Sequence, residues 1–213
     1  MSRTLNPVRT ALATVALLAS MVLPAQAAQA NTPDTVIRDT VEGIIHVLDH
    51  RTDKNRISEP DRAAIRKIIS DHFDFQAMSR LSVGAPWNDA TPAQQAQFTT
   101  LFKELLEYSY GNRLSAYHGQ TIHYDAAEYR GNRARIKSMI IDTDKQTPVE
   151  YRLLKDGDDW RVYDIRIEGV SLVATFRTDF QNEIDSVGFD GLLKSLAKKV
   201  DELKAKDQEH HQG

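Results

Sequence analysis

The sequence of 213 residues contains no cysteine. This absence excludes a disulfide scaffold, an iron–sulfur cluster, a thiolate zinc site and a cysteine nucleophile. The sequence also lacks a G-x-x-x-x-G-K-[ST] and a G-x-G-x-x-G motif, so no phosphate-binding loop is visible. Basic and acidic residues number 27 and 30, a near balance that argues against a general nucleic-acid-binding protein.

The N-terminal segment is typical of a cleaved secretory signal. Arg3 and Arg9 precede an apolar run over residues 11–23, and A-x-A triplets end at Ala27 and Ala30. The run holds about 13 residues, fewer than the roughly 20 that span a membrane. We therefore expect export to the periplasm, removal of residues 1–27 (or 1–30), a folded domain over 31–204, a flexible polar tail over 205–213, and no integral membrane segment.

Helical periodicity dominates the first part of the mature chain. Apolar residues recur with helical spacing over residues 32–49 and again after Ser58. Asp74 is the expected cap of a short helix that ends at Gly84. Thr91 opens a capping box with proline at the first helical position, and the helix that follows is expected to run to residue 118.

The period then changes from helix to strand. Four strands are expected over residues 121–129, 133–142, 148–154 and 160–167, joined by short turns. Helical spacing returns over residues 172–184 and 189–203. The sequence thus predicts an α+β fold: N-terminal helices, a four-stranded antiparallel meander, and C-terminal helices packed on one sheet face.

Two residues near the last strand could carry chemistry. Ser171 lies between a strand and a helix, the context of a nucleophile elbow, but Val173 replaces the final glycine of G-x-S-x-G. A helix N-cap is the favoured interpretation of Ser171. Asp164 could act as a general base if an apolar cavity raised its pKa, and the favoured alternative is a paired structural carboxylate.

A metal site has weak support in the sequence. His46 and His50 lie one helical turn apart, and Asp53 could supply a third ligand, but the glutamate of H-E-x-x-H is missing. A solvated helix face is the favoured interpretation, and we expect neither a metal nor a cofactor. From the residues alone, the chain is an exported α+β domain without catalysis.

Several short motifs occur in order over nearly the whole mature chain. They comprise Phe73-Asp74-Phe75 with Met78, Gly84 with Trp87, the 90–94 segment with Phe98 and Phe102, the 110–121 segment, the run W-R-V-Y-D-I at 160–165 followed by E-G-V-S-L at 168–172, and the 188–192 segment. Together these motifs resemble those of the periplasmic phospholipid-binding component of the Mla lipid-asymmetry transport system, also called the toluene-tolerance family.

The resemblance implies a cone-shaped, NTF2-like fold with an apolar pocket between sheet and helices. It implies a carrier, not an enzyme, that takes a diacyl glycerophospholipid between an outer-membrane lipoprotein complex and an inner-membrane transporter of the ATP-binding-cassette type, and so maintains outer-membrane lipid asymmetry. Expected pocket residues are Met78, Leu81, Trp87, Leu105, Tyr110, Leu114, Ile136, Ile140, Val149, Tyr151, Leu153, Val162, Tyr163, Ile165, Val170, Leu172, Val173 and Phe176.

Two other functions remain open at this point. The first is an exported enzyme on a similar cone-shaped sheet, with Asp164 or His123 as the base. The second is an exported adaptor with a solid core and no ligand. Periodicity does not separate the three, because a packed core and a lipid cavity both present apolar stripes.

Overall fold

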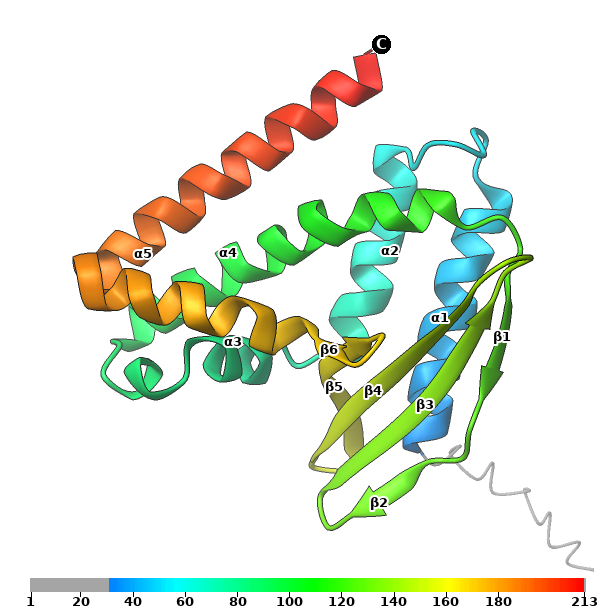
Figure 1. Cartoon of the computed structure of the whole chain (residues 1–213), viewed down its shortest axis with the longest axis horizontal. Coiled ribbons are helices and arrows are strands. Elements are labelled where there is room, and N and C mark those ends of the chain that lie inside the picture. The colour runs from blue at the N-terminus through cyan, green and yellow to red at the C-terminus, as the bar shows by residue number, and fades with distance from the viewer. Residues whose placement is uncertain (1–30, 213) are drawn as a thin grey trace, which may run out of the picture. The chain divides into compact units, whose positions relative to one another are not determined.

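The computed structural model describes residues 31–212, so the expected signal segment lies outside the described residues. The chain runs from helices through a sheet to a long helix, as expected for the α+β class (Figure 1). The helices are α1 (Pro33–His50), α2 (Glu59–His72), α3 (Phe75–Val83), η1 (Ala85–Asn88), α4 (Pro92–Tyr110), η2 (Gly111–Ala116) and α5 (Leu172–Gln212). The strands are β1 (Thr121–Tyr124), β2 (Glu128–Arg130), β3 (Arg133–Ile141), β4 (Gln146–Asp156), β5 (Asp159–Ile167) and β6 (Val170–Ser171).

The helix starts follow local capping chemistry. Thr32, Ser58 and Thr91 each form a capping box, and each is followed by proline in the first turn. Asp74 accepts a hydrogen bond from the backbone N–H of Ala77 at the start of α3. The starts predicted at Ser58, Asp74 and Thr91 are therefore confirmed, and each cap contributes about 1 kcal/mol.

The sheet is antiparallel, with the strand order β1-β3-β4-β5-β6, and β2 also pairs with β3. The single first strand predicted over 121–129 is wrong, since it is split into β1 and β2. The backbone N–H of Ala127 leaves the ladder and donates to the Asp34 carboxylate at 3.2 Å. The short strand β6, which pairs with the end of β5, was also not predicted.

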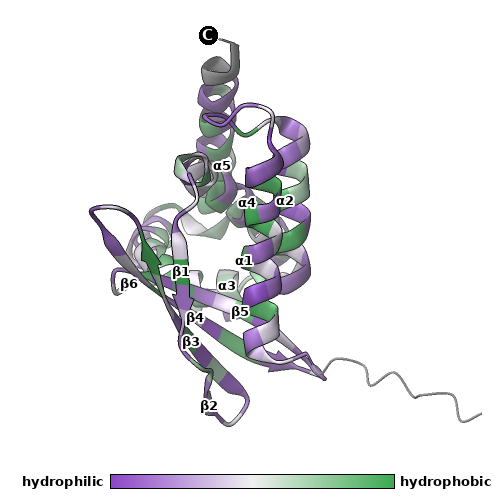
Figure 2. Ribbon diagram, turned by 90° about the vertical axis from the view of Figure 1, so that its right-hand side faces the viewer, coloured by the Kyte–Doolittle hydropathy of each residue, from purple (hydrophilic) through white to green (hydrophobic). Residues whose placement is uncertain are grey.

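One face of the sheet packs on α1 (Figure 2). Val36 and Ile37 of α1 are buried against Ile136, Leu153 and Val162 of the three long strands. On β3, inward apolar residues alternate with outward Arg133, Arg135 and Lys137, as predicted for this strand.

A second apolar core lies among α3, α4 and α5. Its centre is an aromatic cluster formed by Phe98, Phe102, Phe176, Phe180 and Phe189. Ring centroids within the cluster are 5.4 to 6.1 Å apart, in the range of favourable aromatic pairs. This core joins the N-terminal helices to the C-terminal helix.

Two predicted helix ends are wrong. The helix predicted over 92–118 ends at Tyr110 and tightens into the 3₁₀ helix η2. Buried Arg51 donates to the carbonyl oxygens of Ser115 and Tyr117, both at 3.0 Å, and so holds the chain just beyond this point.

The C-terminal helix α5 is also longer than predicted, because it continues to Gln212 instead of ending at Leu203. Residues 205–212 of the segment predicted to be a flexible polar tail are helical, and Asp207 among them forms a buried ion pair with Arg62. A break in helical geometry at Gly188, with φ of 74°, divides α5 into 172–187 and 189–212. The predicted gap between two C-terminal helices falls at this break.

The bend also explains a nearby glycine. A side chain at Gly191 would place its Cβ only 2.4 Å from a side-chain carbon of Val187, so glycine is required beside the bend.

Candidate functional site

A cavity of about 560 Å³ opens between the inner face of the sheet and the helices α1, α2 and α4. Its volume falls in the usual range of small-molecule sites. The wall is mostly aliphatic and aromatic. It includes Val41, Ile44, Ile45, Leu48, Ile57, Ile65, Ile69, Phe73, Phe75, Met78, Leu106, Leu114, Ile122, Ile140, Val149, Ile165, Ile167 and Leu172. Such a wall suits a long apolar ligand better than a polar one.

Helix α1 has two roles along its length. Its first half packs on the sheet through Val36 and Ile37. Its second half turns Val41, Ile44 and Ile45 toward the cavity, and all three are only partly buried. Spacings of three and four residues place these side chains on one helix face. The same amphipathic stripe therefore serves first as core and then as cavity wall.

The sheet wall is shaped by an irregularity in the pairing of β4 with β5. A register shift between Arg152 and Leu153 leaves Val162 opposite Leu153 and Ile165 opposite Tyr151. Both Val162 and Ile165 therefore lie on the inner face, although they are three positions apart and regular alternation would place them on opposite faces. Burial raises the pKa of the Tyr151 phenol, in keeping with the apolar surroundings of this cavity residue.

The predicted pocket residues fall into three groups. Those on the cavity wall are Met78, Tyr110, Leu114, Ile140, Val149, Tyr151, Ile165 and Leu172. Those packed in the cores away from the wall are Leu81, Trp87, Leu105, Val173 and Phe176 among the helices, and Ile136, Leu153 and Val162 on the sheet. Two point elsewhere: Tyr163 lies under the Arg133 guanidinium at the register shift, and Val170 is 64% exposed.

The sequence interpretation missed the wall that α1 and α2 provide. Val41, Ile44, Ile45, Ile65 and Ile69 all line the cavity. The helical spacing of these apolar residues is visible in the sequence, but it was interpreted as a stripe of ordinary core residues. Val41, Ile44, Ile45 and Ile69 stay only partly buried, whereas Ile65 is buried. Partial burial beside an open volume is visible only in the folded structure.

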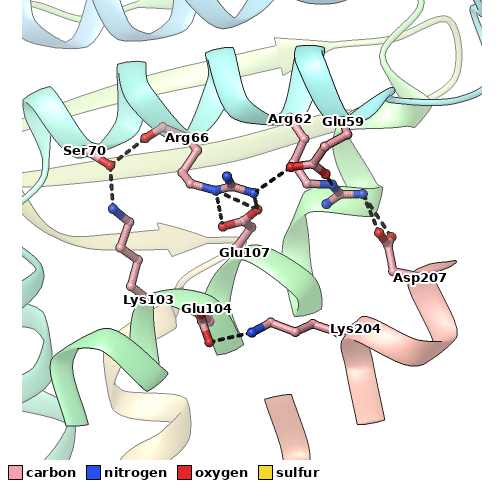
Figure 3. Close-up of polar contacts among 9 residues, drawn as sticks. All are labelled: Glu59, Arg62, Arg66, Ser70, Lys103, Glu104, Glu107, Lys204 and Asp207. Atoms are coloured by element: carbon pink, nitrogen blue, oxygen red, sulfur yellow. Dashed lines mark hydrogen bonds and ion pairs between the residues drawn. The ribbon is translucent and has the colours of Figure 1, made fainter. Parts of the chain in front are cut away.

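Charged and polar side chains occupy two places on the cavity wall. Near the end of the sheet, Gln120 donates to Asp142 at 2.9 Å and Lys145 pairs with Glu168 at 3.1 Å. Between α2 and α4, the Arg66 guanidinium forms a bidentate pair with Glu107, and this hydrogen bonding raises the pKa of Arg66 (Figure 3). Two further cations line the cavity: Lys103 donates to the Ser70 hydroxyl at 2.6 Å, and Arg113 lies over the Tyr110 ring. The interior between these polar groups is apolar and suits a neutral chain.

Asp164 and Ser171 form a cap instead of a catalytic pair. The Ser171 hydroxyl donates to the Asp164 carboxylate at 2.8 Å and accepts from the backbone N–H of Ala174 at 3.0 Å. The backbone N–H of Val173 also donates to Asp164, at 3.2 Å. The predicted N-cap role of Ser171 is confirmed, and the carboxylate is engaged at the start of α5.

The two alternative bases, His123 and Asp164, do not line the same cavity. His123 is exposed and lines a smaller hollow of about 320 Å³ with Lys137, Glu150 and Arg166, whereas Asp164 lines neither this hollow nor the larger cavity.

The two histidines considered as metal ligands, His46 and His50, stack with ring centroids 4.2 Å apart. Within residues 31–212, no group of three or more metal-ligating side chains comes together. In the same residues, no helix is both long and apolar enough to cross a membrane.

Comparison with known proteins gives one consistent match. The family model described as MlaC protein matches residues 38–198. The chain belongs to the MlaC family. It is 28% identical to the toluene tolerance protein ttg2D of Pseudomonas putida over 179 residues, 82% of either chain. It is 22% identical over 141 residues to the intermembrane phospholipid transport system binding protein MlaC of Haemophilus influenzae, covering 63% of this chain and 66% of that one.

A solved structure supports the same fold. The phospholipid-binding protein of Ralstonia solanacearum, solved in complex with a phospholipid, superposes with a TM-score of 0.74 at 24% identity. The match covers 82% of this chain and 98% of that one. The cavity wall, from Thr40 to Leu172, falls inside the MlaC match, whereas Lys204 and Asp207 of α5 lie beyond it.

Proposed function

We propose that this MlaC-family protein is a non-enzymatic carrier that holds a diacyl glycerophospholipid by its acyl chains. The observation that carries the proposal is the cavity of about 560 Å³ with an aliphatic wall. The acyl chains lie in this interior, and the head group lies at the edge of the cavity near Gln120, Asp142 and Lys145, where polar side chains meet water. The phospholipid-binding domain is the folded part of the mature chain, which includes the whole of α5.

The energetics explain why such a carrier is needed. Burial of each methylene group is worth about 0.8 kcal/mol, so two chains of roughly 16 carbons would cost more than about 20 kcal/mol to expose to water. A cavity that covers most of this surface removes most of that cost. The partly buried wall residues Val41, Ile44 and Ile45 can adjust to a flexible chain more easily than the close-packed aromatic cluster can.

The proposed transport role requires a protein that can reach two membranes. We propose that it is exported to the periplasm and exchanges lipid with an outer-membrane lipoprotein complex and an inner-membrane transporter of the ATP-binding-cassette type. The transporter would supply the energy, in keeping with the lack of a phosphate-binding loop in this sequence. If the signal is cleaved on export, the mature N-terminus is Ala28 or Asn31. Edman or mass-spectrometric sequencing of protein recovered from the periplasm tests this directly.

The decisive experiment is mass spectrometry of an organic extract of protein purified without detergent. We expect phospholipid at a sizeable fraction of one molecule per chain. A folded, gently purified sample whose extract contains no lipid would support the adaptor alternative instead. The variant Val149→Trp tests whether the lipid lies in the cavity. A large side chain at this wall position fills part of the cavity and should lower the lipid content.

A further inference from the structure

The helices that enclose the cavity form two groups. Helix α2 packs on α1, whereas α4 packs on α5. Figure 3 shows that charged side chains bridge α2 and α4. Arg66 of α2 pairs with Glu107 of α4 at 2.6 Å, and both residues lie on the cavity wall. We call this boundary between α2 and α4 the seam.

The end of α5 crosses the seam and contacts both sides of it. Lys204 pairs with Glu104 of α4 at 3.0 Å. One turn later, Asp207 accepts two hydrogen bonds from the guanidinium of Arg62 on α2, both at 2.9 Å. The Tyr108 ring of α4 faces both cations, with Arg62 5.6 Å and Lys204 5.9 Å from its centroid. The end of α5 therefore connects helices that belong to different groups.

The way α5 is attached changes near Leu203. Leu192, Leu196 and Val200 are buried in the helical core, and Leu203 packs against its edge. Beyond Leu203 the attachments that the structure describes are polar, through Lys204 and Asp207. This final part also lies outside the MlaC family match, which ends at residue 198. Residues 204–212 can therefore detach by breaking polar contacts, while the rest of α5 stays packed.

The Arg62–Asp207 pair ties this movement to the cavity. Arg62 is only 5% exposed and lies on the cavity wall. Arg62 also pairs with Glu59, but at 3.8 Å, so Asp207 at 2.9 Å is the closer of these two carboxylates. Because a buried guanidinium is destabilising when its ion pairing weakens, the departure of Asp207 favours movement of Arg62 toward water. Because Arg62 is part of α2, its movement loosens the wall along the seam.

We propose that residues 204–212 form a strap that closes a lateral portal between α2 and α4, and that a phospholipid enters and leaves the cavity through this portal. Asp207 acts as a positioning residue, since it holds Arg62 in the closed wall. Lys204 anchors the strap to α4. The proposal rests on the proposed lipid-carrier function and adds to it the route of the ligand and the element that controls it.

The test measures the rate of lipid transfer from full-length protein loaded with pyrene-labelled phosphatidylglycerol to vesicles of phosphatidylethanolamine and phosphatidylglycerol. Asp207→Asn should speed transfer by about 5- to 30-fold, the range expected when one favourable contact of the closed state is lost. The matched control Asp179→Asn removes a carboxylate from an exposed position on the same helix and should transfer at the wild-type rate. Transfer by Asp207→Asn at or below the wild-type rate would overturn the strap.

Two further variants separate strap opening from general destabilisation. Asp207→Glu keeps a carboxylate opposite Arg62 and should bring transfer back toward the wild-type rate, whereas simple loss of the native side chain at this position would leave transfer as fast as in Asp207→Asn. The double variant Glu104→Cys/Lys204→Cys, joined by a bismaleimide in this cysteine-free chain, should slow transfer at least several-fold. Unchanged transfer after cross-linking would overturn the strap. A wild-type protein that neither holds nor transfers lipid would instead refute the carrier function itself.

Discussion

The aromatic cluster between α4 and α5 and the cavity beside the sheet are both built from apolar side chains on amphipathic helices, but they pack differently. In the aromatic cluster, Phe98 and Phe102 have no exposed surface, and every ring contacts another ring. Around the cavity, Val41, Ile44 and Ile45 are partly buried and face an open volume. A close-packed cluster specifies one arrangement, whereas a partly open wall can accept a ligand of variable shape.

The two regions meet at the start of α5. Leu172 lines the cavity, and its neighbour Val173 is buried in the helical core. Asp164 and Ser171 fix this junction by capping the helix. The close-packed helical core can therefore stabilise the fold, while the less closely packed cavity wall stays open for a ligand. Each of the following predictions tests this division.

The largest expected effect is on stability in the aromatic cluster. Phe98→Ala should lower the free energy of unfolding by about 3–5 kcal/mol, because the site is surrounded by Trp87 and phenylalanine rings and cannot collapse fully. Ile44→Ala on the cavity wall should cost clearly less, since its side chain contacts protein on only part of its surface. Urea unfolding of both variants measures the difference, and equal losses would contradict the division into core and wall.

The next prediction concerns ligand content at Val149, a buried residue on the sheet wall. Val149→Trp should fold nearly as well as the wild type but hold less lipid, because the indole occupies space in the cavity. Val149→Ala should retain lipid and lose little stability, since an acyl chain can fill the gap. Thermal unfolding combined with lipid stoichiometry tests both. In a solid core, the larger residue would instead cost about 1–3 kcal/mol without changing the lipid content.

A smaller effect is expected at the junction of the two regions. Ser171→Ala removes the N-cap of α5 and a hydrogen bond to Asp164, and should lower stability by about 0.5–2 kcal/mol. Lipid binding per folded molecule should persist. Chemical denaturation and lipid extraction measure the two quantities. A hydrolytic activity that this substitution abolishes in folded protein would show that Ser171 is a nucleophile and not a cap.

The effect expected to be smallest at neutral pH is a pH dependence of stability on the sheet side, which develops only in alkaline solution. Burial raises the pKa of Tyr124 to about 12, from 10.0 for an unperturbed phenol. The folded protein therefore holds this proton more tightly, so the contribution to stability is present below pH 10 and is lost as the pH rises toward 12. Tyr124→Phe should flatten this alkaline loss of stability. Unfolding curves across that pH range measure it, and the exposed control Tyr129→Phe should leave the curve unchanged.

Much of the fold could be predicted because its signals are local. The caps at Ser58, Asp74 and Thr91 depend on side chains within three residues of the helix start. The strands β3, β4 and β5 follow from alternation of apolar and polar residues. The predictions failed where distant groups decide, as at Ala127, whose N–H bonds to Asp34 and so interrupts the first strand.

The sequence by itself determined the order of the main helices and of the three long strands, the inner and outer faces of β3, and the motifs that mark the MlaC family. Only the tertiary structure decided that Ile140 and Val149 line a cavity while Ile136 and Leu153 do not. Apolar periodicity indicates that a side chain is removed from water, but it does not indicate whether that side chain faces other protein atoms or an open cavity. In the same way, the polar end of α5 gained a partner only when folding brought Asp207 to Arg62, 145 residues away in the sequence.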